Sequence, residues 1–259
     1  EIVCNAHLIN RGELPRLESS KDRLSDFYFM RQDDPDRAAD IIVDLVKNHI
    51  PRRFQLDPFD EIQVLSPMHK GTVGAANLNL RLQQALNPEG EALQRGERLY
   101  RLGDKVMQIK NNYQIEWEIV GRYNIPIDKG MGVFNGDMGR VKEINDTMST
   151  LLVEFDDGRR VNYPFSALEE LELSYAITIH KSQGSEYPAV ILPLLGGPRM
   201  LFNRNLLYTG ITRARNCVTI LGSSETVRNM IENVSENRRY TGLEQRIREI
   251  CCLPENDTP

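Results

Sequence analysis

Two segments in the first third of the chain, one after Pro35 and one over 72–86, place apolar residues at the helical period of about 3.6 residues. A helix is expected after Asp33-Asp34-Pro35, because a carboxylate caps free N–H groups and proline fits the first helical turn. A second amphipathic helix is predicted over residues 72–86, and short strands over 26–30 and 62–65. The apolar face of the first helix would comprise Ala38, Ile41, Ile42, Leu45 and Val46.

From about Gly96 the pattern changes to that of short strands separated by tight turns. Strands are predicted over 104–110, 139–144, 151–155 and 159–163, the last two joined by the turn Asp156-Asp-Gly158. This spacing favours a small β-barrel at residues 97–170.

Near-continuous apolar runs follow at 173–179, 189–193 and 217–221, with helical segments between and after them. Such runs are typical of a parallel sheet covered on both faces. The predicted fold is therefore an α/β domain made of residues 1–96 and 171–240, interrupted by the β-barrel. Residues 241–259 are expected to form a C-terminal helix and a partly disordered tail.

Composition narrows the class of protein. The chain has 259 residues, 40% hydrophobic content and a net charge of −5, so binding to nucleic acid would need a local basic groove. No apolar run approaches the roughly 20 residues that span a membrane, and the start Glu1-Ile-Val-Cys-Asn-Ala-His has no basic n-region and no signal-peptide core. The four cysteines and four histidines show no metal-site spacing, so we expect no metal site and a reduced, cytoplasmic setting. The start in mid-pattern without methionine suggests an excised piece.

A nucleotide-hydrolysing P-loop is missing from the sequence. That loop needs a Gly-Lys pair followed by Ser or Thr, and no Gly-Lys pair occurs. The acidic pair Asp60-Glu61 precedes an apolar strand, whereas a metal-binding pair should follow one. We therefore expect that this chain does not hydrolyse ATP alone.

The run from Thr178 to Glu186 places hydrogen-bond donors and a glycine after a buried strand. Ligands of open α/β sheets lie beyond the carboxyl ends of strands, so these groups should enter a cleft. The alternative is a polar loop with a helix cap. The predicted DNA-phosphate ligands are Thr178, His180, Lys181 and Ser182, and the residues predicted to face nucleotide are Gln183, Gly184 and Glu186.

A second run, Asn205 to Arg215, contains Tyr-Thr-Gly-Ile-Thr-Arg-Ala-Arg. If the run is helical, Tyr208, Thr212 and Arg215 share a face and Arg213 lies on another. An arginine delivered to a γ-phosphate stabilises phosphoryl transfer, and Arg213 is the candidate. The alternative is that both arginines are solvated surface residues.

Two further segments carry candidate DNA contacts. In Ser66-Pro-Met-His-Lys-Gly71 a strand leads into a helix start, where free N–H groups with Ser66, His69 and Lys70 would bind phosphate. Asn77 and Asn79 would serve packing or capping. In the barrel, Tyr113 or Phe134 could stack on a base and Lys110 could meet phosphate, the alternative being barrel core and turn chemistry.

Taken in order, these segments resemble the C-terminal part of a RecD-like superfamily 1 DNA helicase, from about Asn5 to Gly222. The last two motifs, which resemble motifs V and VI, are the most specific. The matching segments are Ser66-Pro-Met-His-Lys-Gly, Gly103-Asp-Lys-Val-Met-Gln, Asn111-Asn-Tyr, Val133-Phe-Asn-Gly-Asp, Ala176-Ile-Thr-Ile-His-Lys-Ser-Gln-Gly-Ser-Glu and Leu206-Leu-Tyr-Thr-Gly-Ile-Thr-Arg-Ala.

The resemblance implies a second RecA-like lobe with an inserted SH3-like barrel, in an enzyme of DNA repair or recombination. It also implies single-stranded DNA as partner, 5′-to-3′ translocation, and ATP with Mg²⁺ bound mainly by an N-terminal P-loop lobe of the same polypeptide. Arg213 would be the arginine finger. The stretch 114–131 departs from the family pattern and resembles an insertion.

Two other interpretations stay open. One is a non-catalytic module that docks DNA or protein through an SH3-like barrel, which the absent P-loop favours and the intact finger motif disfavours. The other is that the parent protein is a relaxase–helicase fusion.

Overall fold

The computed structural model describes residues 1–17, 25–234, 242, 246–247 and 250. Most of the predicted C-terminal segment 241–259, including Cys251 and Cys252, lies outside the described residues. Within the described residues, no helix has the length and hydropathy needed to span a membrane.

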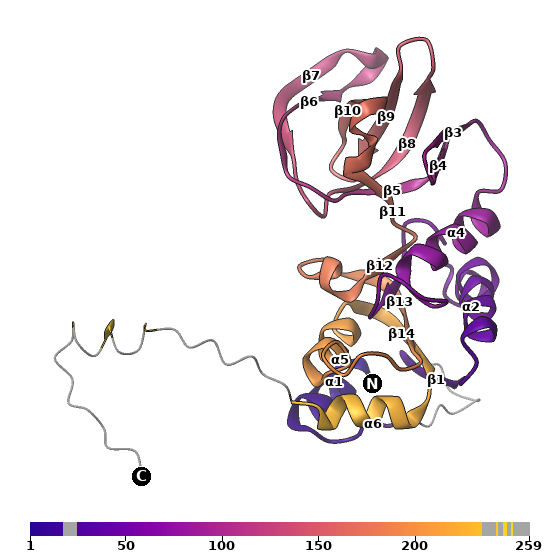
Figure 1. The fold of residues 1–259 in the computed structure, drawn as a ribbon, viewed down its shortest axis with the longest axis vertical. Coiled ribbons are helices and arrows are strands. Elements are labelled where there is room, and N and C mark those ends of the chain that lie inside the picture. The colour runs from indigo at the N-terminus through magenta and orange to yellow at the C-terminus, as the bar shows by residue number, and fades with distance from the viewer. Residues whose placement is uncertain (18–24, 235–241, 243–245, 248–249, 251–259) are drawn as a thin grey trace.

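A five-stranded parallel sheet forms the lower half of the molecule in Figure 1. Its central strands are almost wholly buried, as their continuous apolar sequences predicted. In spatial order the strands are β1 (Phe27–Arg31), β14 (Ala214–Gly222), β13 (Tyr187–Leu194), β2 (Ile62–Ser66) and β12 (Ala176–Thr178).

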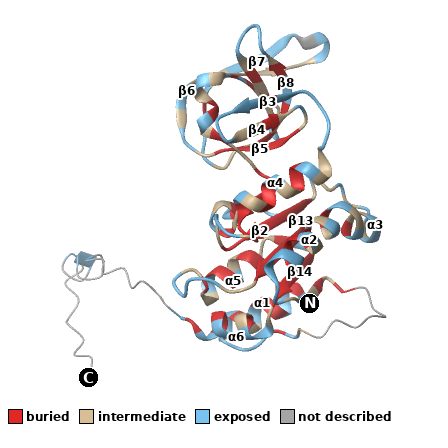
Figure 2. Cartoon of the chain, turned by 45° about the vertical axis from the view of Figure 1, so that its right-hand side comes forward, coloured by how far each residue is buried: buried red, intermediate tan, exposed pale blue. Residues whose placement is uncertain are grey.

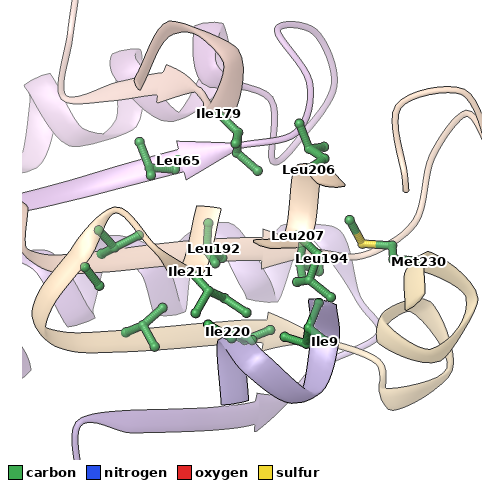
Figure 3. Packing of buried hydrophobic residues seen from close by; sticks show 14 of the residues in the cluster. Ile9, Leu65, Ile179, Leu192, Leu194, Leu206, Leu207, Ile211, Ile220 and Met230 are labelled. Carbon is green, nitrogen blue, oxygen red and sulfur yellow. The ribbon is translucent and has the colours of Figure 1, made fainter. Parts of the chain in front are cut away.

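Helices cover both faces of this sheet, which confirms the predicted arrangement (Figures 1 and 2). On one face, α1 (Ile2–Arg11), α5 (Arg204–Ile211) and α6 (Ser224–Glu232) pack into the core shown in Figure 3, to which Ile9, Leu192 and Met230 contribute. On the other face, α2 (Pro35–Asp44) and α4 (Ala75–Leu86) form a second core with the π-helical turn Leu45–His49 and α3 (Ile50–Phe54).

The helix boundaries follow local sequence signals. The carboxylate of Asp34 caps α2 by accepting from the N–H groups of Asp36 and Arg37 at 2.9 and 3.3 Å. Helix α4 begins at Ala75, three residues later than predicted, because residues 72–74 form a turn. Helix α1 was not predicted, although Gly12 with a φ of 84° marks its end.

An antiparallel sheet of seven strands forms the upper, curved half (Figure 1). It surrounds a third core that also takes in Leu93 and Tyr100 from the two-stranded hairpin β3 (Ala92–Arg95) and β4 (Arg98–Arg101). In spatial order the seven strands are β11 (Leu171–Leu173), β5 (Lys105–Gln108), β8 (Met138–Asn145), β9 (Thr150–Phe155), β10 (Arg159–Pro164), β6 (Asn112–Val120) and β7 (Pro126–Val133).

The prediction that residues 173–179 form one continuous strand was wrong. The apolar run 173–179 is divided between the two sheets, because β11 pairs with β5 whereas β12 pairs with β2. No strand was predicted over 114–131, the stretch that resembles an insertion, and it forms most of the β6–β7 hairpin. Trp117 packs flat on the hairpin, since a Cβ on Gly130 would lie 2.4 Å from the Trp117 ring.

Asp104 joins the two halves of the molecule. Its side chain is fully buried and accepts hydrogen bonds from Gln83 and Asn87 of the α4 region at 2.5 and 2.8 Å. It also accepts from the hydroxyl of Tyr175 at 2.9 Å and from the N–H of Arg101 at 2.7 Å. Burial raises the pKa of Asp104, and these hydrogen bonds oppose the rise. The carboxylate therefore holds the start of β5 against the α/β half.

Lys105, the next residue, is a buried cation at the same junction. Its ammonium group donates to the side-chain oxygen of Gln63 at 2.9 Å, and Gln63 in turn donates to the carbonyls of Ser174 and Tyr175. Burial lowers the pKa of Lys105 to about 8, opposed by the nearby carboxylate of Asp156. The amide of Gln63 in β2 thus connects Lys105 of β5 to the chain between β11 and β12 through hydrogen bonds.

The lowered pKa of Lys105 predicts a pH dependence of stability. Between pH 8 and 10.5 the unfolded chain retains a proton that the folded chain has lost, so stability should rise with pH in this window. At about 1.4 kcal/mol per pKa unit the gain is about 2–4 kcal/mol. Denaturant unfolding of the native chain and of Lys105→Met at several pH values would measure it. If the free energy of unfolding rose equally with pH in both proteins, the lowered pKa of Lys105 would be contradicted.

Candidate nucleic-acid and nucleotide interface

Two predicted loops leave the parallel sheet side by side. Strands β2 and β12 are parallel neighbours in which Ser66 lies opposite Thr178. Each is the last residue of its strand, and the loops that follow contain His69-Lys70 and His180-Lys181. The carboxyl edge therefore brings together two basic segments that are more than 100 residues apart in sequence.

The buried hydroxyls in these loops shape the loops. Ser66 is fully buried, and its hydroxyl donates to the carbonyl of Val73 at 2.8 Å. Ser182 is also fully buried and donates to the carbonyl of Ile179 at 2.7 Å. Neither presents its hydroxyl to solvent, whereas His69, Lys70 and His180 are exposed and Thr178 and Lys181 are half-buried.

The expected free N–H groups at the start of α4 are not free, which corrects the sequence interpretation. The N–H groups of Ala75 and Ala76 donate to the carbonyls of Met68 and His69, each at 3.0 Å. The preceding loop folds back and satisfies these donors itself. Anion binding here would depend on the side chains of His69 and Lys70.

Glu172, which the sequence reasoning overlooked, lies among the cations. Its carboxylate is 2.9 Å from the ammonium of Lys181, 3.5 Å from Arg98 and 4.0 Å from His69. Burial opposes ionisation of Glu172, but the hydrogen bond and charge of Lys181 outweigh it, so the pKa of Glu172 is lowered. Glu172 ends up at this site through the pairing of β11 with β5.

The asparagines after the His69 loop have packing roles. The amide of Asn79 donates to the carbonyls of Leu173 and Ala176 and accepts from the N–H of Ala176 at 2.8 Å. Asn77 donates to the carbonyl of Thr72 at 2.6 Å. Asn79 thereby fixes the chain where it passes from one sheet to the other.

The loop from Thr178 to Glu186 connects the carboxyl edge with the opposite end of the sheet. After the 3-10 turn Ile179–Ser182 it passes through Gln183 and Gly184, which has a φ of 91°, and enters β13 at Tyr187. There the N–H of Tyr187 donates to the carbonyl of Arg213 at 2.8 Å. The predicted nucleotide-facing loop and Arg213 therefore meet.

Arg213 is held by this loop with part of its guanidinium unpaired. One terminal nitrogen donates to the carbonyl of Ser185 at 3.0 Å, and the other lies 3.5 Å from the hydroxyl of Thr212. Its Nε is buried and has no hydrogen-bond partner among the residues that the structure describes. A buried donor without a partner is costly, so a movement of the side chain that let Nε form a hydrogen bond would be favourable.

Arg215 does not share a helix face with Tyr208, as a continuous helix would require. Helix α5 ends at Ile211, and Arg215 lies at the start of β14. Its exposed guanidinium forms an ion pair of 2.8 Å with Glu186. The pair joins the start of β14 to the predicted nucleotide-facing loop at the protein surface.

The aromatic candidates of the barrel lie together. The exposed rings of Tyr113 and Phe134 are arranged edge to face with centroids 5.7 Å apart, and Lys110 pairs with Glu169 at 2.8 Å. The rings are accessible to a base.

The acidic pair Asp60-Glu61 shows no sign of a metal site. Asp60 forms an ion pair with Arg140 of β8, and the described residues contain no cluster of three or more metal-ligating side chains.

Comparisons with known proteins agree with this architecture. Residues 78–155 match the family model of the ATP-dependent RecD-like DNA helicase SH3 domain, and residues 173–221 match the UvrD-like helicase C-terminal domain. The ATP-dependent RecD2 DNA helicase of Deinococcus radiodurans is 32% identical over 95% of this chain and 30% of its own length. The RecBCD enzyme subunit RecD of Mycolicibacterium smegmatis is 30% identical over 76% of this chain and 31% of its own length.

A solved structure of the Pif1 helicase from Bacteroides, in complex with ADP-AlF3 and ssDNA, aligns with a TM-score of 0.49 at 16% identity. The alignment covers 97% of this chain and 54% of that chain.

The parallel sheet and the matched C-terminal domain define a lobe of the superfamily 1 helicase class. Within that class, the chain is related to the C-terminal part of RecD-like DNA helicases: a RecA-like lobe with an inserted SH3-like barrel. The resemblance predicted from the motifs is thus confirmed. The chain spans about 30% of the length of the curated relatives it matches.

Proposed function

We propose that this chain is the second lobe of an ATP-dependent RecD-like DNA helicase, which grips single-stranded DNA and delivers Arg213 to ATP. ATP and Mg²⁺ would be held mainly by a P-loop lobe of the same polypeptide. The observation that carries the proposal is the 178–186 loop, which connects a basic edge of the sheet to a partly unpaired arginine.

The basic edge is suited to the backbone of a DNA strand. His69, Lys70 and His180 are exposed beside Thr178 and Lys181, where they would contact successive phosphates. Backbone contacts carry no sequence information, as a motor that advances along any sequence requires. Ser66 and Ser182 would act by holding the two loops in shape, and the exposed rings of the barrel offer stacking to bases.

The nucleotide end of the proposal rests on Arg213. A guanidinium aimed at the γ-phosphate stabilises the charge that develops during phosphoryl transfer. To reach across a cleft, Arg213 would give up its hydrogen bond to the carbonyl of Ser185 and bind the γ-phosphate instead. Gln183, Gly184 and Glu186 would then move with the loop. Because Thr178 begins the same loop, closure over ATP would change the grip on DNA. Translocation from 5′ to 3′ is proposed by analogy with the family.

Anisotropy of labelled single-stranded DNA across a salt series would test the grip. We expect His69→Ala/Lys70→Ala to weaken binding by about tenfold or more, because each charged hydrogen bond contributes about 1.5–3 kcal/mol. Loss of one phosphate contact should lower the salt slope by about 0.7. Glu172→Gln should act in the opposite direction, because it releases Lys181 and His69.

Lys47→Ala is the matched control, since Lys47 is exposed on the π-helical turn away from the carboxyl edge. Equal losses for Lys47→Ala and the double variant would indicate attraction by bulk charge. Absence of binding even at low salt would overturn the proposed grip and favour a docking module that binds protein.

A further inference from the structure

The loop 195–203 leaves the same edge of the sheet as the two basic loops. It follows β13, which pairs with β2 on one side and β14 on the other. It also touches the His69 loop, because a Cβ on Gly197 would lie 3.0 Å from the sulfur of Met68, the residue before His69. A DNA strand held at His69 and Lys70 would thus pass close to this loop.

Buried contacts hold the loop in one shape. The side-chain amide of Asn233 is buried and donates to the carbonyls of Arg199 and Phe202 at 2.6 and 2.8 Å. Gly197 lies directly on the Phe202 ring, where a Cβ would come within 2.4 Å of a ring carbon. Arg199 and Met200 are left exposed, Met200 with 85% of its surface accessible.

A cavity of about 410 Å³ lies between this loop and α6. The volume falls within the range of about 300–1,000 Å³ typical of small-ligand pockets. Its lining combines one cation, Arg199, and one carboxylate, Glu232, with the amide of Asn229 and the hydroxyl of Thr226. A lining without net charge suits a neutral group with hydrogen-bonding edges better than a phosphate. Unpaired nucleobases have this chemistry, and their free edges pair with amide and carboxylate side chains.

We propose that this cavity is a subsite for one unpaired nucleobase of the DNA strand, with Arg199 beside the adjoining phosphate. The proposal rests on the proposed function, because it requires a DNA strand at His69 and Lys70. A base inserted here would add to the backbone grip and keep the strand from slipping while Arg213 moves.

The test uses the whole chain and two DNA probes, a 16-nucleotide single strand and the same strand made entirely of abasic sites. Asn229→Ala should weaken binding of the normal strand by about tenfold and leave binding of the abasic strand unchanged. Arg199→Ala should weaken both. Arg228→Ala, an exposed arginine on the same helix but outside the cavity lining, is the charge control.

Two results would overturn the subsite without overturning the proposed grip on DNA. One is unaltered binding of the normal strand by Asn229→Ala while His69→Ala/Lys70→Ala still weakens binding, which leaves the proposed function intact. The other is an equal loss for Asn229→Ala on both probes, which would assign Asn229 to the backbone. If neither probe binds the unmodified chain, the proposed grip fails and the subsite fails with it.

Discussion

Replacing Arg213 with alanine is expected to lower the DNA-stimulated ATPase rate by about 10³–10⁵-fold in a polypeptide that joins this chain to a P-loop lobe. The reason is that Arg213 combines a buried, unpaired Nε with a terminal nitrogen held on the nucleotide-facing loop. Steady-state phosphate release, measured beside DNA anisotropy, would check the result. Binding of single-stranded DNA should be unchanged, because the basic edge lies at the other end of the 178–186 loop.

Two further variants distinguish an arginine that contacts the γ-phosphate from one that only stabilises the fold. Arg213→Lys keeps the charge but loses the planar fork of donors, so most of the loss should persist. Arg215→Ala removes only an exposed ion pair with Glu186, and such pairs contribute about 0–1 kcal/mol, so its effect should be small. If Arg213→Ala retained the full ATPase rate, the proposal that it contacts the γ-phosphate would fail.

Replacing Asp104 with alanine is expected to lower the free energy of unfolding by about 3 kcal/mol or more. The buried carboxylate accepts from four donors, and each donor left without a partner costs about 1–3 kcal/mol, partly offset because burying the carboxylate is itself unfavourable. Urea unfolding would measure the change. Because Gln83 and Tyr175 lie on the α/β side of Asp104, limited proteolysis should also cut faster near the junction.

Asp128→Ala is the control for Asp104, since Asp128 is exposed on the β6–β7 hairpin and, among the described residues, accepts a hydrogen bond from the N–H of Lys129 alone. We expect it to change stability by less than about 0.5 kcal/mol. Equal effects of the two replacements would show that Asp104 does not clamp the halves together.

Local chemistry predicted much of this fold. Strands β2, β13 and β14 contain apolar runs that are typical of a sheet covered on both faces. Asp34-Pro35 specifies a helix start without help from distant residues. The β6–β7 hairpin escaped prediction because much of its surface is exposed. Strand β6 does alternate apolar and polar residues at Ile115-Glu-Trp-Glu-Ile119, but β7 contains a proline, two glycines and the charged pair Asp128-Lys129, which obscure the hairpin in the sequence.

The division of the chain into residues 1–96 with 171–240 and 97–170 remains a prediction, as do the assigned DNA and nucleotide contacts. The structure shows which of the predicted site residues lie close together. Ser66 and Thr178 lie opposite each other in neighbouring strands, and Arg213 contacts Ser185.

The sequence by itself determined the fold class and the family, because apolar periodicity and the two motifs at 176–186 and 206–214 are encoded by adjacent residues. Only the tertiary structure decided which groups at the site are free to bind. Glu172 reaches Lys181 through the pairing of β11 with β5, and the start of α4 is satisfied by its own preceding loop. The availability of a donor or a charge depends on contacts between segments distant in sequence, and no local pattern records those contacts.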